Sequence, residues 1–205
     1  LSSRRALSGA AMRARVALSL DLPLGSGVHG DGLALALISR RDVSREWLAV
    51  PSTGGLPQRR LAARLLERAA REAAQRFAEG DASGVRVFET EVVASAWERL
   101  LGDRESLVWR HVETARGLLV EARPTFREEI ERHLDPALGI TEWRRAAASL
   151  AASIAVAPKE GLEACRALFS TPMFSKDRGL GAAMVLGLPR AAEREPEAVE
   201  QLLTH

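Results

Sequence analysis

The sequence predicts an all-α fold built from stacked pairs of helices, and three observations support this prediction. Ala, Leu, Arg and Glu dominate the chain, Tyr is absent and aromatic residues make up only 4%, whereas strands favour aromatic and β-branched side chains. Several segments carry apolar residues at helical spacing. The chain also aligns with itself when it is shifted by 34 residues, and a period of this length is typical of helical repeat proteins.

The composition excludes several classes of protein. The chain has 205 residues, of which 46% are hydrophobic and 27% charged, as in soluble globular proteins. Cys165 is the single cysteine, so neither an internal disulfide nor a cysteine-rich zinc site can form, and we expect a reducing, cytoplasmic location. The longest apolar runs, such as residues 146–157, are shorter than the ~20 residues of a membrane span, so we expect no membrane association.

Positive charge gathers in the first part of the chain, although the formal net charge is only +2. Residues 1–80 hold 13 arginines against 7 acidic residues, and the remainder is net negative. Lys159 and Lys176 are the only lysines, and so uniform a use of Arg indicates a composition bias. Net charge is therefore a weak argument for nucleic-acid binding.

The N-terminal segment, residues 1–55, is predicted to form irregular helices and loops that pack against the rest of the chain. Its apolar runs are short, and Pro and Gly interrupt them. We expect helices over residues 3–20 and 32–39, one or two helical turns over 45–50, and loops over 22–30 and 51–55.

The clearest helix is expected over residues 56–80. Pro57 suits the first turn, where a helix needs no backbone N–H, and Gly80 suits the end. Arg and Glu fill most of the remaining positions. One apolar stripe at helical spacing consists of Leu61, Leu65, Leu66, Ala69, Ala73 and Phe77.

Further helices are expected between short breaks at Pro, Gly or Asp-Pro, of which Pro189 is the last. Asp103 and Ser106 offer capping groups to one of them. The last, over residues 196–203, lacks a second helix to pair with, so we expect the chain to be a fragment of a longer protein. The expected ranges are 85–101, 103–122, 125–134, 141–156, 159–169, 176–188 and 196–203.

Two ladders of equivalent positions define the 34-residue repeat. In each unit a shorter helix ends near a Leu, and a longer helix then begins near an Arg and continues through small residues. Trp109 and Trp143 also occupy equivalent positions, where we expect them in the core. The Arg ladder is Arg110, Arg144 and Arg178, with Arg60 in an earlier copy, and the Leu ladder is Leu100, Leu134, Leu168 and Leu202.

This pattern resembles the HEAT repeat, whose second helix tends to read Asp, Val-Arg, Ala-Ala and then Ala-Leu-Gly. Residues 143–151 (WRRAAASLA) and 177–187 (DRGLGAAMVLG) carry the resemblance, residues 60–66 look like an earlier copy, and Trp twice replaces Val. The resemblance covers about residues 56–205. It implies an α-solenoid of antiparallel helix pairs, with second helices lining a concave, partner-binding side. It also implies ladder arginines paired with acidic residues, for which the candidates are Asp103, Glu142 and Asp177.

No catalytic or cofactor site is predicted. Residues 25–30 match G-x-G-x-x-G, but no succession of strands and helices follows, so we interpret them as a glycine loop. Cys165 lies between apolar residues of an expected helix, where a small buried side chain is the simplest interpretation. The carboxylates of Glu128, Glu129 and Glu131 are expected on a solvated helix face.

No metal site is predicted either, because the histidines are scattered and lack ligand spacing. His111 and Glu113 lie two residues apart on one expected helix. We expect a surface or packing role for them. The four histidines are His29, His111, His133 and His205.

The basic stretch over residues 58–76 is the strongest indication of a binding surface. Some of its arginines fall on one helical face, where they could contact phosphate. Glu67, Glu72 and Glu79 interleave with them and predict compensation at i,i+4 spacing on a solvated face, so both interpretations stay open. The candidate surface consists of Arg59, Arg64, Arg68 and Arg71.

The leading functional hypothesis is a non-catalytic scaffold or adaptor that binds a protein or peptide, by analogy of architecture. The first alternative is a nucleic-acid-binding or DNA-repair protein, because HEAT-like alkylpurine glycosylases use a basic concave surface with Trp and a carboxylate. Trp109, Trp143 and Asp177 would then take part. The second alternative is a regulatory module of a larger enzyme. No cofactor is expected, and the oligomeric state stays open.

Overall fold

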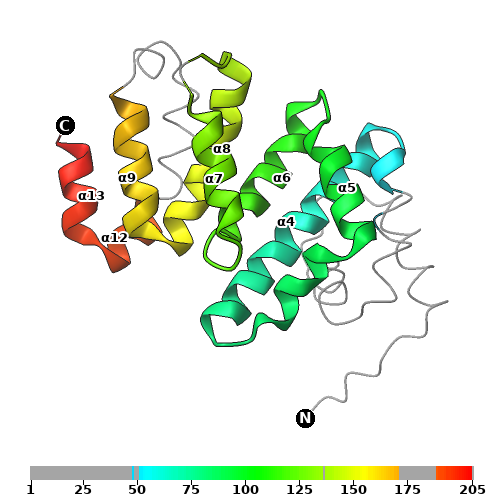
Figure 1. Ribbon diagram of the computed structural model, residues 1–205, viewed down its shortest axis with the longest axis horizontal. Coiled ribbons are helices and arrows are strands. Elements are labelled where there is room, and N and C mark those ends of the chain that lie inside the picture. The colour runs from blue at the N-terminus through cyan, green and yellow to red at the C-terminus, as the bar shows by residue number, and fades with distance from the viewer. Residues whose placement is uncertain (1–47, 49–50, 136, 171–187, 205) are drawn as a thin grey trace.

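The part of the chain that the structure describes is helical throughout its regular elements (Figure 1). The structure is a computed structural model that describes residues 48, 51–135, 137–170 and 188–204. Within these residues there are helices and no strands, which confirms the all-α prediction. Among the same residues, no helix combines the length and apolar character that crossing a membrane requires.

The helices form two rows. In Figure 1, α4, α6 and α8 follow one another across the molecule, with α6 packed against both of its neighbours and α12 against α8. Helices α5, α7 and α9 pack beside α6 and α8, and α13 packs against α9. The bounds are α4 Leu56–Ala78, the 3-10 helix η1 Ala82–Glu89, α5 Glu91–Leu101, α6 Ser106–Leu118, α7 Thr125–His133, α8 Ile140–Val156, α9 Pro158–Phe169, α12 Leu188–Arg194 and α13 Pro196–Leu203.

Helix α4 begins and ends as its sequence predicts. Pro57 lies in the first turn, and the Gln58 side chain accepts a hydrogen bond from the Gly55 N–H at 2.9 Å. Gly80 has a φ of 92°, a conformation that glycine adopts without strain. Because α4 packs against both η1 and α6, its buried face differs from the predicted stripe, of which Leu61 and Phe77 are only partly buried. The buried residues are Ala62, Ala63, Leu65, Leu66, Ala69, Ala70 and Ala73.

The single helix predicted over residues 85–101 is wrong, because the chain breaks at Thr90 into η1 and α5. The Thr90 hydroxyl donates to the Val87 carbonyl at 2.7 Å, and its own φ and ψ are extended. In the 3-10 geometry Val85 and Phe88 lie on one face and are both buried. The tighter turn thus buries apolar side chains that a regular helix would spread over a wider arc.

Three other boundaries differ from the predictions. Residues 51–53, expected in a loop, are helical. The helix expected over 103–122 is shorter, since α6 starts at Ser106 and Leu118 is its last residue. Helix α12 was not predicted because Pro189 was interpreted as a break, although proline is tolerated in the first turn of a helix.

The remaining expected helices divide into those that the structure describes and those that it does not. Helices α7, α8, α9 and α13 start and end within one residue of the predicted ranges. The glycine loop at residues 25–30 and the helices expected over 3–20 and 32–39 lie outside the described residues, as does 176–188 except for its last residue. The division of the chain at residue 55 stays a prediction.

Glycines set the closest helix contacts. A Cβ atom added to Gly117 of α6 would overlap the Ser149 carbonyl oxygen of α8. A Cβ atom on Gly161 of α9 would lie 2.9 Å from the Cα atom of Ile154, also in α8. Helix α8 is therefore approached closely from two directions, and only glycine permits these backbone separations.

Candidate functional site

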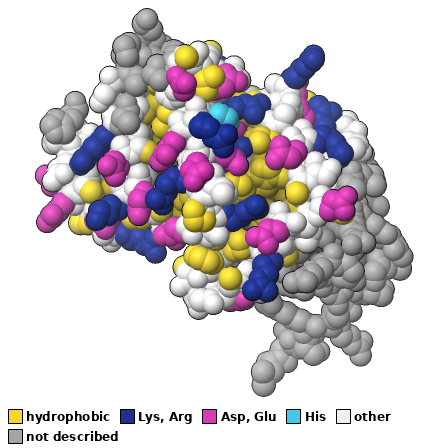
Figure 2. Space-filling view, viewed as in Figure 1, with side chains coloured by type: hydrophobic (Ala, Val, Ile, Leu, Met, Phe, Trp, Pro, Cys, Tyr) yellow, Lys and Arg dark blue, Asp and Glu magenta, His cyan; other side chains and the backbone are white. Residues whose placement is uncertain are grey.

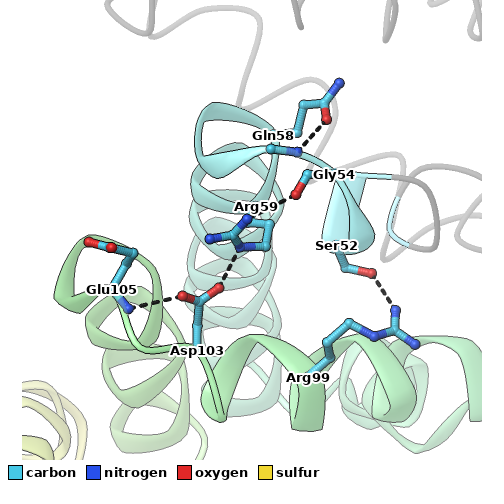
Figure 3. A network of polar contacts seen from close by, with 8 residues as sticks. Ser52, Gly54, Gln58, Arg59, Arg99, Asp103 and Glu105 are labelled. Carbon is cyan, nitrogen blue, oxygen red and sulfur yellow. Dashed lines mark hydrogen bonds and ion pairs between the residues drawn. The ribbon is translucent and has the colours of Figure 1, made fainter.

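The four arginines of the candidate surface on α4 interact with neighbouring groups. Arg59 donates from Nε to Asp103 Oδ2 at 2.6 Å and from Nη1 to the Gly54 carbonyl at 2.9 Å (Figure 3). Arg71 pairs with Glu67 at 3.0 Å, four residues before it. Arg64 and Arg68 also have interaction partners. Much of the positive charge on this candidate surface is therefore compensated within the fold.

Asp103 joins the start of α4 to the loop before α6. Its side chain is only 8% exposed, and its Oδ1 accepts the Glu105 N–H at 2.9 Å while Oδ2 receives Arg59 (Figure 3). Close by, Arg99 of α5 donates to the Ser52 hydroxyl at 2.9 Å. Asp103, a candidate partner for a ladder arginine, thus pairs with Arg59 of the candidate surface.

Glu67 connects α4 to α6. Its Oε2 lies 2.6 Å from Nδ1 of His111, and its Oε1 accepts from Arg71. Burial acts to raise the pKa of Glu67, but the hydrogen bonds from His111 and Arg71 outweigh it, and the pKa lies below its ordinary value. Together with the Arg76–Glu72 pair at 3.1 Å, this confirms the predicted i,i+4 compensation for Glu67 and Glu72.

The ladder positions occupy similar places in successive helices. Trp109 and Trp143 lie in the first turns of α6 and α8 and are 5% and 1% exposed, which confirms their placement in the core. Arg110 and Arg144, directly after them, are exposed, and Arg60 is partly buried. Arg178 lies outside the described residues. The Leu positions fall at or next to the last turns of α5, α7, α9 and α13 and are Leu100, Leu134, Leu168 and Leu202.

A group of charged side chains is buried between α6 and α8, and we call it the Glu113 cluster. Glu113 is fully buried, and its Oε2 accepts the Ser149 hydroxyl at 2.7 Å. Arg116 Nη1 lies 3.2 Å from the same oxygen, and Arg145 Nη1 lies 3.9 Å from Oε1. Arg116 Nε also lies 3.4 Å from Glu129 Oε2. Since Glu113 has no exposed surface, a solute cannot contact its carboxylate, and the cluster joins α6 to α8.

The central position of Glu113 was not predicted from the sequence. It lies four residues after Trp109, one after Val112 and three before Arg116, so all four share one helical face. That spacing was the available signal. In the structure the Arg145 guanidinium also lies 5.2 Å from the Trp109 ring centroid, which places the second cation of the cluster over an aromatic face.

An open groove lies between α7, α8 and α9, and we call it the α7–α9 groove. Its volume is about 360 Å³, within the range typical of ligand sites. Figure 2 shows apolar patches among charged side chains on the face that carries these helices. Four charged residues, Arg127, Glu131, Glu160 and Glu163, form the rim. The floor residues are Val120, Ile130, Leu134, Leu150, Ser153, Ala157, Gly161 and Ala164.

The rim of the α7–α9 groove is mainly acidic. Glu131 extends from α7 and Glu160 and Glu163 from α9, and all three are exposed. None of them forms an ion pair with a residue that the structure describes. Arg127 is the one cation among the described lining residues. The acidic groups of this rim, unlike those of α4, are thus available to an external cation.

The described residues do not assemble a recognisable reaction centre. Burial raises the pKa of the Cys165 thiol to about 12, so this cysteine stays protonated and is a poor nucleophile. Among these residues, no group of three His, Cys, Asp or Glu side chains could hold a metal ion. His29 and His205 lie outside this part of the chain.

Two features of the described residues are therefore candidates for a functional role. The Glu113 cluster is closed, whereas the α7–α9 groove offers apolar surface and unpaired carboxylates to another molecule. No signal in the sequence pointed to the groove, because three helices contribute to it and only Leu134 among its lining residues belonged to a predicted site. No protein-family model, curated protein or solved structure matches the chain.

Proposed function

We propose that this chain is a non-catalytic interaction module, a HEAT-like α-solenoid that binds an apolar segment of a partner protein in the α7–α9 groove. The observation that carries the proposal is the groove itself, which combines an apolar floor with a charged rim. Covering apolar surface contributes about 25 cal/mol per Å² removed from water. The charged rim then selects among apolar segments. A cytoplasmic location is part of the same proposal.

The arrangement of the helices supports the solenoid part of this proposal. Helices α4, α6 and α8 pack in sequence, and α5, α7 and α9 lie beside them (Figure 1). Stacking of this kind lets each helix pair bury the apolar stripe of its neighbour. The groove differs from the binding side that the HEAT resemblance implies, because α7 and α9, the first helices of their units, provide most of its lining.

The placement of the aromatic and basic residues favours a protein partner over nucleic acid. Bases stack on exposed aromatic rings, but Trp109 and Trp143 are buried. Phosphate binding requires cations that are not already paired, and Arg59 and Arg71 form ion pairs with carboxylates. Asp177, the carboxylate considered for DNA repair, lies outside the described residues.

The direct test is a selection of random peptides displayed on phage against the wild-type chain and against Ala164→Phe. Ala164 lies on the floor of the groove and is partly exposed, so a Phe side chain there would fill it. We expect peptides with apolar residues that bind the wild type and lose at least tenfold in affinity on Ala164→Phe. Ala78→Phe, at an exposed position of α4 outside the groove, is the matched control and should bind as the wild type does.

Two results of this selection, and one separate binding measurement, would count against the proposal. One is the absence of any peptide that binds the wild type better than Ala164→Phe. Another is a set of peptides that Ala78→Phe weakens as much as Ala164→Phe does. The third is tight binding of a fluorescent DNA duplex that falls steeply with salt, which would favour nucleic acid instead.

A further inference from the structure

We infer that the partner segment of the α7–α9 groove is a basic amphipathic helix, with apolar side chains on one face and Lys or Arg flanking that face. This inference rests on the proposed function and specifies its partner. It follows from two properties of the groove: the lack of hydrogen-bonding capacity in its floor, and the sign and position of its rim charges.

The floor favours a helix over an extended chain. Its one polar side chain is Ser153, which is buried and donates its hydroxyl proton to the Leu150 carbonyl at 2.9 Å. An extended segment in the groove would leave backbone N–H and C=O groups without partners. It would also have no strand edge to join among the described residues. A helix satisfies its own backbone and presents apolar side chains at i, i+3 and i+4 to an apolar groove.

The rim favours a basic partner. Glu131 lies on the α7 side together with Arg127, and Glu160 and Glu163 lie on the α9 side, so the rim carries three carboxylates and one guanidinium. All three are exposed and lack an ion-pair partner in the described part of the chain. On α4, by contrast, Glu67 and Glu72 are each neutralised by an arginine four residues later. A helix whose cations face Glu160 and Glu163 would complement the rim, while an acidic helix would be repelled.

Three synthetic peptides test the inference against the full chain by fluorescence anisotropy at low and high salt. Each has about 15 residues, near the length at which isolated helices become stable. The first has Leu at helical spacing on one face and Lys elsewhere. The second replaces every Lys with Glu, and the third keeps Lys and replaces every Leu with Ser. We expect the first peptide to bind at least tenfold more tightly than either of the others.

Reversing the charge of the acidic rim residues should reverse the preference for the Lys peptide over the Glu peptide. We expect Glu131→Lys/Glu160→Lys/Glu163→Lys to weaken the Lys peptide at least tenfold, since each exposed pair contributes a factor of up to about five and the substitutions add repulsion. The same variant should strengthen the Glu peptide. Glu128→Lys, exposed on α7 outside the groove, is the matched control and should change binding of the Lys peptide less than twofold. Circular dichroism checks that each variant stays folded, and the corresponding Glu→Gln variants replace any that does not.

The outcomes separate the partner's chemistry from the function. If the Glu peptide binds as tightly as the Lys peptide and Ala164→Phe removes both, the groove binds helices and the charge inference is overturned. If the Ser peptide binds as well as the Leu peptide, attraction by charge alone explains the result and the inference is overturned. If sedimentation shows a dimer that Ala164→Phe dissociates, the occupant is a second copy. If no Leu peptide distinguishes the wild type from Ala164→Phe, the proposed function falls as well.

Discussion

Helix α8 takes part in two contacts of different kinds. Towards α6 it forms a closed contact, in which Ser149 meets the backbone of Gly117 and its hydroxyl binds the buried carboxylate of Glu113. Towards α7 and α9 it lines an open groove with Leu150 and Ser153. Small residues occur on both sides, so their presence alone does not close a contact. Glycines let the backbones approach on both sides, at Gly117 and at Gly161. The α6 side is distinguished by its buried Glu113, which binds Ser149 and lies near Arg145 of α8.

Glu113→Ala should cause the largest loss of stability. It leaves Arg116, which is 3% exposed, as a buried charge without its nearest partner, and breaking a buried ion pair costs about 3–5 kcal/mol. Ser149 can still donate to the backbone carbonyl of residue 113 at 3.0 Å. Urea denaturation measures the free energy of unfolding.

A double substitution separates charge burial from packing. Glu113→Leu/Arg116→Met removes both charges and should regain much of the stability lost in Glu113→Ala, because replacing a whole buried pair by apolar side chains is often neutral. Glu128→Ala, at an exposed position of α7, should change the free energy of unfolding by less than about 0.5 kcal/mol. A Glu113→Ala chain as stable as the Glu128→Ala control would contradict the role of the Glu113 cluster.

Gly117→Ala should rank second. Its new Cβ atom would overlap the Ser149 carbonyl oxygen and lie 2.8 Å from Ala152 Cβ, so α6 and α8 must separate. Overpacking of this kind costs about 1–3 kcal/mol, and we expect the upper end because two backbones are involved. Gly102→Ala is the control: Gly102 has a φ of −74°, and its nearest atom, the Glu98 carbonyl oxygen, lies 3.4 Å away. Equal thermal midpoints for the two variants would refute this account of the closed contact.

Gly161→Ala should have a smaller effect than Gly117→Ala. Its Cβ atom would lie 2.9 Å from Ile154 Cα, but α9 borders the open groove and has space to shift. We expect a loss of about 1 kcal/mol, near the lower end for overpacking. Thermal unfolding of both variants under the same conditions compares the two sides of α8. A loss as large as that of Gly117→Ala would indicate that the groove side is packed as rigidly as the α6 side.

The smallest expected effect is the contribution of His133 to the pH dependence of stability. Burial lowers the pKa of His133, against the attraction of Glu113, and the positive charges of Arg116 and Arg145 lower it further. The folded state therefore binds this proton less readily than the unfolded chain, where histidine titrates near its ordinary value of about 6.5. Stability attributable to His133 is present above that value and is lost as the pH falls from about 6.5 through the folded-state pKa.

The measurement is the free energy of unfolding at several pH values between neutral and mildly acidic conditions. We expect it to fall less steeply with decreasing pH in His133→Gln than in the wild type. His111→Gln serves as the comparison on α4's side of α6, where the imidazole faces the carboxylate of Glu67. Parallel pH curves for His133→Gln and the wild type would show that the fold does not lower the pKa of His133.

Prediction from sequence succeeded where the signal is local. Pro57 and Gly80 marked the ends of α4, because proline fixes φ and glycine alone accepts a φ of 92° without strain. It failed at Thr90, where apolar spacing fits both a regular helix and a 3-10 helix followed by a break. It also failed at Pro189, since the same residue can start a helix or stop one.

The amino-acid sequence alone determines the helix content, the core positions of Trp109 and Trp143, and the absence of internal disulfides. Helix propensity and periodicity depend on nearby residues, and the cysteine count depends on composition alone. Whether a carboxylate such as Glu113 is buried, and whether three helices leave a groove between them, depends on which residues meet across the fold. Burial and charge pairing depend on contacts between residues that are distant in the sequence. Glu113 and Ser149, for example, are 36 residues apart, and nothing in the sequence around either residue indicates that they meet.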